Sequence, residues 1–197
     1  MKGLMLFLLT GLILLIGCGE EENFIPKPKS YFRIDFPAKS YQTNSEKCNA
    51  NFEVPTYTYI QNKKSPKEGI CFQNIVFPYY KASIYCTYLR LDSNFYEHSE
   101  ECRKKAFEHQ SRAQAIDEKL FVNEEKRVFG TTFDIKGDVA CNYMFYLTDS
   151  TNHFFAGSVF FEVIPNYDSL QPVIEFVKED IQHLIETFEW NAQVENE

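Results

Sequence analysis

The alternation of apolar and polar residues predicts three neighbouring strands in the C-terminal half of the chain. Apolar residues recur at every second position in residues 127–135 and 139–148, which is the period of a β-strand. Residues 154–163 carry apolar side chains on both faces, which predicts a central strand covered on both sides. The segments between them, residues 136–138 and 149–152, are rich in turn-forming residues. We therefore expect three consecutive antiparallel strands, a meander near the C-terminus.

Two segments have the periodicity of helices instead. Residues 168–188 repeat apolar side chains every three or four positions, which predicts a strongly amphipathic helix across the meander. Residues 95–120 follow Asn94, a helix-start residue with Glu97 three positions later, and carry a thinner apolar stripe. We expect this second helix to lie on the surface of a sheet. The carboxylates of the last helix are predicted to form a solvated face: Glu175, Glu179, Asp180 and Glu186.

Further strands are expected in the N-terminal half. Residues 31–36 alternate, and residues 70–77 and 82–91 are apolar or alternating segments. Residues 52–60 favour an edge strand, because the proline at position 55 cannot donate to a central ladder. The predicted fold class is α+β: a mostly antiparallel sheet with a C-terminal three-strand meander and two principal helices packed on the sheet.

The N-terminus has a different composition from the rest of the chain. Residues 4–16 are almost all apolar, a run shorter than the roughly 20 residues that cross a bilayer but typical of an export signal. The sequence LIGC that ends at Cys18 resembles the lipobox of bacterial lipoproteins, in which the cysteine receives a diacylglyceryl group and becomes the new N-terminus. A plain secretory signal and an anchor helix are the alternatives, and three glutamates at 20–22 argue against an anchor helix.

These features predict four parts: a signal peptide over residues 1–17, a lipid-anchored tether over 18–30, a single globular domain over 31–190 and a frayed tail over 191–197. The chain contains 19 Phe and 12 Tyr, enough for a sizeable core without a cofactor or metal. Its net charge of −8 disfavours nucleic acid and electrostatic attachment to anionic lipid. Membrane association is therefore expected to come from palmitate-type acyl chains on Cys18, of which stable anchoring needs more than one.

The cysteines predict one disulfide. With Cys18 acylated, five of the six cysteines remain, so at least one thiol stays unpaired in an oxidising compartment. Cys48 and Cys71 flank a polar, loop-like stretch at 61–69, where a bridge would stabilise the fold by about 3 kcal/mol in the chain-entropy model. We expect the bridge Cys48–Cys71. The pairing of three others stays open: Cys86, Cys102 and Cys141.

No constellation of catalytic residues is evident. His98 and Cys102 lie four positions apart on a predicted helix and could begin a zinc site, but such a site needs three or four ligands. The other histidines accompany no nucleophile motif. We expect neither catalytic residues nor a metal site. A group of tyrosines favours core or edge packing, with an interface patch as the alternative: Tyr79, Tyr80, Tyr85 and Tyr88.

Several strings resemble the GldD family of gliding-motility lipoproteins. They are PKPKSYFRIDFP at 26–37, NIVFP at 74–78, FDIKGDVA at 133–140, FYLTDST at 145–151 and DSLQPVIEFVKEDIQHLIETFEW at 168–190. The resemblance implies a cell-envelope lipoprotein of gliding Bacteroidetes, needed for gliding and, through companion lipoproteins, for type IX secretion. It implies no catalytic residues, it carries over Cys18 as lipid acceptor, and it favours the Cys48–Cys71 bridge.

We therefore expect a non-enzymatic component of the gliding machinery, with no cofactor. It would contact other gliding-motility lipoproteins and secretion-machinery proteins, anchored preferentially to the outer membrane and facing the periplasm or the surface. Two alternatives stay open. One is a periplasmic small-ligand-binding lipoprotein with an aromatic-lined cleft between sheet and helices. The other is a metal-dependent hydrolase built on His98 and Cys102.

Overall fold

The computed structural model describes residues 33–44, 48–65 and 67–191 of the 197-residue chain. These described residues belong to one compact unit. The predicted signal peptide (1–17), the predicted tether (18–30) and Cys18 lie outside the described residues, as does the predicted tail after Asn191.

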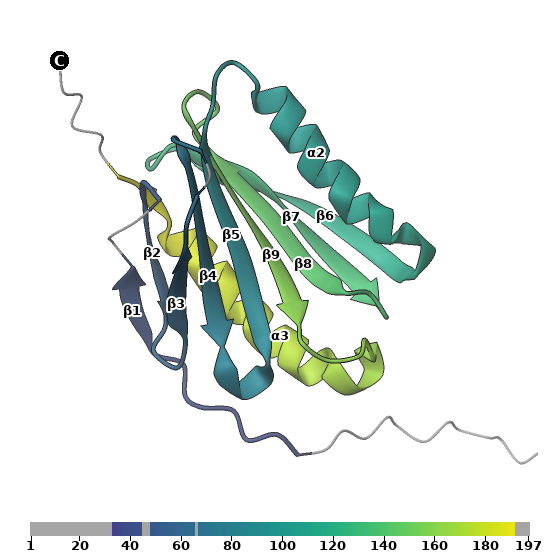
Figure 1. Ribbon diagram of the computed structural model, residues 1–197. Helices are drawn as coiled ribbons and strands as arrows, with labels where there is room; N and C mark the ends of the chain where they lie inside the picture. The colour runs from purple at the N-terminus through teal and green to yellow at the C-terminus, as the bar shows by residue number, and fades with distance from the viewer. Residues whose placement is uncertain (1–32, 45–47, 66, 192–197) are drawn as a thin grey trace, which may run out of the picture. The chain divides into compact units, whose positions relative to one another are not determined.

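The centre of the unit is a seven-stranded sheet in which all neighbouring strands run antiparallel (Figure 1). In spatial order its strands are β3 (Tyr59–Lys63), β4 (Ile70–Phe77), β5 (Ala82–Arg90), β9 (His153–Phe161), β8 (Cys141–Thr148), β7 (Val128–Gly137) and β6 (Ala113–Asn123). β5 and β9 join the N-terminal strands to the C-terminal ones, so the whole sheet is a single layer.

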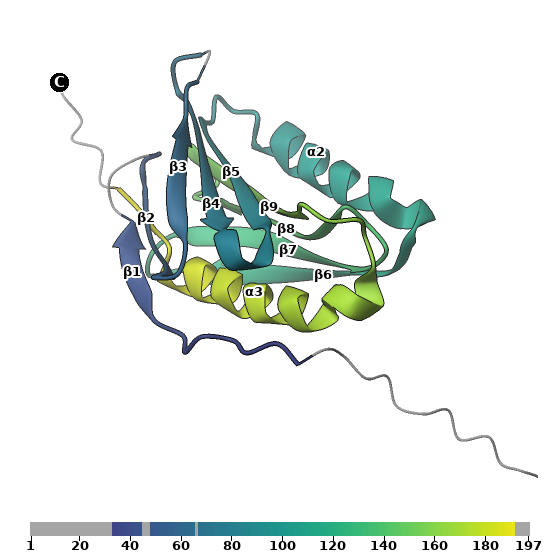
Figure 2. The same ribbon diagram turned by 60° about the horizontal axis from the view of Figure 1, so that its bottom comes forward.

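Two helices cover opposite faces of this sheet (Figures 1 and 2). α3 (Tyr167–Thr187) packs on one face, and the side chain of Asn166 caps its start by accepting a hydrogen bond from the Ser169 N–H. α2 (Phe95–Phe107) packs on the other face and continues as a short 3-10 turn, η2 (Glu108–Ser111). The predicted α+β class with two principal helices on an antiparallel sheet is confirmed.

A second, small sheet lies in the same layer as α3. Its order is β1 (Tyr41–Asn44), β2 (Ala50–Pro55) and β10 (Glu189–Trp190), all antiparallel. The main core fills the space between this layer and the seven-stranded sheet. Each large aromatic side chain buried there contributes about 1.5–3 kcal/mol relative to exposure. The largest are Phe52, Phe77, Phe145, Phe155 and Phe188.

One glycine makes room for this core. Gly157 in β9 is directly paired with Phe145 in β8, and both lie on the α3 side of the sheet. A Cβ atom at Gly157 would collide with the Cε1 and Cζ atoms of the Phe145 ring. The absence of a side chain at this position therefore allows the ring to lie flat across the neighbouring strand.

The helix predicted over residues 95–120 is correct only in its first half. α2 ends at Phe107, and after η2 the chain forms β6, an edge strand paired with β7 along nearly its full length. Residues 113, 116 and 120 have helical spacing, but positions 116, 118, 120 and 122 also share one face of a strand. The hydrogen-bonded pairing with β7 makes this segment a strand and not a helix. The local sequence does not reveal that pairing, because it depends on residues elsewhere in the chain.

The predicted C-terminal three-strand meander is not present in that form. β7, β8 and β9 do pair in sequence order, but β6 extends this run on one side and β5 flanks it on the other. The last strand, β10, belongs to the small sheet. The three consecutive strands β7, β8 and β9 are therefore part of a larger, seven-stranded sheet.

Two predictions in the N-terminal half are also wrong. Of the strand predicted over 31–36, the described residues 33–36 have no regular structure; neither have residues 37–40, and β1 begins only at Tyr41. The edge strand predicted over 52–60 is two strands, because the chain turns after Pro55, where the Thr58 N–H donates to the Pro55 carbonyl. β2 is the middle strand of the small sheet, and Pro55 is its last residue.

Candidate functional site

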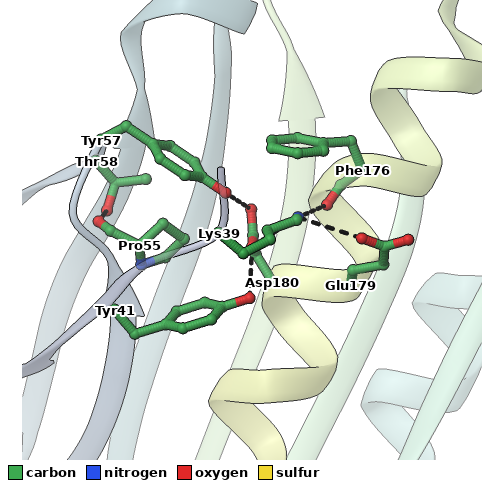
Figure 3. Close-up of polar contacts among 8 residues, drawn as sticks. All are labelled: Lys39, Tyr41, Pro55, Tyr57, Thr58, Phe176, Glu179 and Asp180. Atoms are coloured by element: carbon green, nitrogen blue, oxygen red, sulfur yellow. Dashed lines mark hydrogen bonds and ion pairs between the residues drawn. The ribbon is translucent and has the colours of Figure 1, made fainter. Parts of the chain in front are cut away.

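A buried carboxylate joins four separate parts of the chain. Asp180 in α3 is only 1% exposed, and its Oδ1 atom accepts hydrogen bonds from Lys39 Nζ at 2.8 Å and Tyr41 OH at 3.1 Å. Tyr57 OH donates to Oδ2 at 2.7 Å. Figure 3 shows the donors converging on the helix from the irregular segment, from β1 and from the β2–β3 turn. We call Lys39, Tyr41, Tyr57 and Asp180 the carboxylate cluster.

The ammonium group of Lys39 is held on several sides at once. Besides Asp180 it donates to the carbonyl oxygen of Phe176 at 2.6 Å, and it lies 3.5 Å from Glu179 Oε2 (Figure 3). It also lies 3.4 Å from the centroid of the Phe176 ring, a cation–π contact. The segment that precedes β1 is thereby fastened to the middle of α3.

The two tyrosines of the cluster are fixed as hydrogen-bond donors. Burial raises the pKa of Tyr41 to about 12, with further contributions from the negative charge of Asp180 and the hydrogen bond to it. The pKa of Tyr57 is raised even further by burial, the hydrogen bond to Asp180 and its charge. Since both carboxylate oxygens are engaged, the arrangement is suited to holding chain segments together rather than to proton transfer.

An aromatic hollow of about 350 Å³ lies beside the carboxylate cluster and shares Tyr57 with it. The Phe36 ring stacks on Phe176 with centroids 4.4 Å apart and lies 5.8 Å from the Tyr80 ring. The lining residues are Asp35, Phe36, Pro37, Tyr57, Tyr79 and Tyr80. With one carboxylate among mostly aromatic side chains, the hollow has the chemistry of a contact surface.

A second cavity, of about 150 Å³, lies between α2 and the sheet and contains His98 and Cys102. The aromatic rings of Phe133 and Phe154 form part of its wall. Burial raises the pKa of the Cys102 thiol to about 11, so the thiol is protonated near neutral pH. Within the described residues no three His, Cys, Asp or Glu side chains are grouped so as to hold a metal ion.

The structure contains the expected bridge between Cys48 and Cys71, whose Cα atoms are 5.3 Å apart. It ties the start of β2 to β4 and so links the small sheet to the large one. Cys86 and Cys141 are free and buried, and Cys102 is free and partly buried. Burial raises the pKa of Cys86 and Cys141 above the usual value for a thiol.

Removing the bridge is expected to destabilise the unit. The double variant Cys48→Ser/Cys71→Ser should unfold with a free energy about 3 kcal/mol lower, because the unfolded chain regains the freedom of the closed loop. Urea denaturation of the oxidised proteins measures this difference. Cys102→Ser is the matched control and should be nearly neutral. A reducing agent should lower the urea midpoint of the unmodified protein and leave the double variant unchanged; the opposite pattern would contradict the role of the bridge.

His153, His183 and Tyr88 occupy structural positions. His153 is buried and shares a 2.8 Å hydrogen bond between its Nδ1 atom and Tyr88 OH. His183 Nε2 lies 2.6 Å from Glu53 Oε2, which links α3 to β2. Of the four tyrosines considered in the sequence, Tyr88 is in the core, while Tyr79 is 92% exposed. The alternatives of core packing and surface patch therefore apply to different members of the group.

His153 gives the unit a predicted pH dependence. Burial lowers its pKa below the value of about 6.5 in an unfolded chain. As pH falls through the pKa of the unfolded state, His153 becomes protonated in the unfolded chain while it stays neutral in the folded one. The unfolded state is thereby stabilised, so the free energy of unfolding decreases. Urea denaturation at about pH 8 and about pH 5 should show this loss, and it should be smaller in His153→Gln. An equal loss in both proteins would assign the effect to other groups.

The sequence analysis identified none of the four residues of the carboxylate cluster as site residues. Asp180 was expected on the solvated face of the last helix, but it is buried. It follows Val177 by three positions and precedes Leu184 by four, so it interrupts the buried stripe. A charged residue at such a position is the one signal in the sequence that could have indicated a buried partner.

Comparisons with known proteins agree with this architecture. The model of the family described as "Gliding motility lipoprotein GldD" matches residues 21–190. The solved structure titled "Solution Structure of Cyanobacterial PsbP (CyanoP) from Synechocystis sp. PCC 6803" is similar, with a TM-score of 0.50 and 9% identity, covering 78% of this chain and 94% of that chain. At this identity the likeness shows a PsbP-like fold alone. No curated protein matches the chain.

Across residues 33–44, 48–65 and 67–191, no helix has both the length and the apolar composition that a membrane span requires.

Proposed function

Because the chain belongs to the GldD family of gliding-motility lipoproteins, and is thus a membrane-anchored protein of the cell envelope, we propose that it is a non-enzymatic component of the gliding machinery. Acyl chains on Cys18 would hold it at the outer membrane. The domain would support type IX secretion through contacts with other gliding-motility lipoproteins and with secretion-machinery proteins. The family match over residues 21–190 carries this proposal.

The carboxylate cluster supports a role as a lipid-anchored scaffold. The segment that follows the predicted tether is fixed to α3 by Lys39 and by the stacking of Phe36 on Phe176. A force applied between the membrane and a partner on the domain would therefore pass into α3 and the main core. Such fastening serves a protein that transmits load or holds a position.

Replacement of the lipid acceptor tests the proposal. In a gliding host, Cys18→Ala should move the protein out of the membrane fraction, stop colony spreading and reduce both adhesin secretion and the levels of companion lipoproteins. Cys102→Ala is the matched control, because this free thiol lies inside the domain and should leave all four readouts unchanged. Normal spreading and secretion in the Cys18→Ala strain would refute the proposal.

A second candidate function is the binding of a small ligand. The cavity between α2 and the sheet supports it, because it combines aromatic walls with polar groups from His98 and Glu101 at about 150 Å³. Native mass spectrometry of the protein purified from its host should then show a bound small molecule. Ala156→Phe, which fills the cavity from β9, should remove it; an unliganded mass for the unmodified protein would end this candidate.

A further inference from the structure

Large apolar side chains are exposed together at one end of the sheet. Tyr79 is 92% exposed and Ile164 is 88% exposed, values that are unusual for side chains of this size. Three more exposed apolar residues lie at the same end. We call the set the tether-end patch: Tyr59, Tyr79, Phe160, Val163 and Ile164.

The strand register places these residues at one end. Ala82, the first residue of β5, pairs with Phe77 and with Phe161, so the β4–β5 connection and the end of β9 are adjacent. The Glu162 N–H donates to the Lys81 carbonyl at 2.7 Å, which joins the two loops directly. Tyr79 lies two positions before Lys81 and Ile164 lies two positions after Glu162, so the two side chains belong to neighbouring loops.

The same end receives the chain from the predicted anchor. Phe36 lies against Tyr80 in the aromatic hollow, beside Tyr79. The segment carrying Phe36 enters at the lower end of the sheet in Figure 1, whereas the C-terminal strand β10 lies at the upper end, paired with the first residues of β2. The patch and the entry of the chain therefore coincide.

The length of chain between anchor and domain limits what the patch can meet. From Cys18 to Arg33 the chain can reach at most about 50 Å when fully extended. The sheet itself is about 30 Å long, as the nine residues of β5 indicate. If the opposite end of the sheet faced the bilayer, the chain from Cys18 would have to run along the whole side of the domain before it entered the fold, which would use most of its maximum length. If the tether-end patch faces the bilayer, the chain enters the fold directly at the membrane and no such detour is required.

The chemistry of the patch fits a bilayer surface. Tyrosine has an apolar ring and a polar hydroxyl, and is enriched where hydrocarbon meets headgroups. Basic residues accompany acidic ones beside the patch: Arg33 is paired with Asp35 at 3.1 Å, and the Lys81 carbonyl accepts a hydrogen bond from the Glu162 N–H. Asp138 and Asp168 add negative charge near Ile164, so the contact is expected to depend on the apolar side chains and not on charge.

We propose that the tether-end patch rests in the interfacial layer of the bilayer that anchors the protein, with Tyr79 and Ile164 inserted among the headgroups. This inference rests on the proposed lipid anchor at Cys18. The contact would give the domain a fixed orientation relative to the bilayer. In that orientation the bilayer does not cover α2, the C-terminal strand β10 or the edge strand β6, so these elements stay available to partners.

Photolabelling of the lipidated full-length protein tests the contact. The protein is reconstituted in vesicles of phosphatidylethanolamine and phosphatidylglycerol containing a phosphatidylcholine with a diazirine group, and adducts are mapped by mass spectrometry. We expect adducts in residues 78–81 and 162–166. We expect none around Tyr96 in α2, or around Leu120 and Val122 in β6, although these side chains are also highly exposed.

Matched variants distinguish a specific contact of the patch from nonspecific binding of exposed apolar side chains to lipid. Tyr79→Ser/Ile164→Ser should lose most of the adducts, and Leu120→Ser/Val122→Ser should keep them, with unchanged circular dichroism in both. Equal labelling at both ends, no labelling of the patch, or cross-links between two copies through Tyr79 would overturn the contact. An intact mass without lipid, together with failure to sediment with vesicles, would instead overturn the anchor and the patch with it.

Discussion

Asp180→Ala is expected to lower the free energy of unfolding by about 3–5 kcal/mol, the cost of removing one partner from a buried charge pair. The substitution leaves Lys39, whose side chain is only 25% exposed, with the more distant Glu179 as the remaining acidic partner of its ammonium group. It also leaves the hydroxyl groups of Tyr41 and Tyr57 without their acceptor. Urea denaturation monitored by circular dichroism measures the loss.

Two variants show whether burial causes this effect. Glu179→Ala removes a carboxylate from the next position, 3.5 Å from the same ammonium but 70% exposed, and should cost no more than about 1 kcal/mol. Asp180→Asn keeps an oxygen acceptor and should fall between the two. If Asp180→Ala were as mild as Glu179→Ala, the carboxylate cluster would contribute little to the fold. Limited proteolysis within residues 33–40 should accelerate in Asp180→Ala alone.

Gly157→Ala is expected to destabilise the unit by about 3 kcal/mol, at the upper end of the usual cost of overpacking. The added methyl group meets the Phe145 ring, which is fully buried and packs near Phe155. A ring in this position cannot turn away without displacing other core side chains. The same denaturation measurement gives the value.

A double-mutant cycle identifies the collision as the cause. Phe145→Leu destabilises the core by itself, but it removes the Cε1 and Cζ atoms that meet the new methyl group. Gly157→Ala should therefore cost clearly less in the Phe145→Leu background, a coupling that neighbouring residues commonly show. Strictly additive effects would mean that the alanine acts through the backbone of β9 instead.

The sequence predicted those parts of the fold in which local pattern and tertiary packing agree. The period of two in β7, β8 and β9 and the apolar stripe of α3 each describe a surface that is buried in the structure. The strands and the helix each depend on a repeated pattern. The Cys48–Cys71 bridge was expected from a polar stretch and from the family resemblance, although β2 and β3 lie between the two cysteines.

The features that were missed depend on partners distant in the sequence. β6 has apolar residues at positions that suit a helix, and only its ladder with β7 makes it a strand. From the sequence, Asp180 was predicted to lie on a solvated face. In the structure it is hydrogen-bonded to Lys39 and Tyr57, which come from the N-terminal part of the chain. The position of Asp180 within the buried stripe signals a buried partner, but it does not identify that partner as an ammonium and two phenols. The aromatic hollow was unpredictable for the same reason.

The pairing of β10 with β2 bears on when folding can finish. Trp190 pairs with Ala50, and Phe188 packs on Phe52 and Phe155 in the centre of the core. These contacts join residues near the two ends of the described chain, so the core cannot close until the last residues have emerged. A chain that emerges from its N-terminal end can therefore close its main core only after residues 188–190 are free to pack, which makes closure of the core a late step of folding.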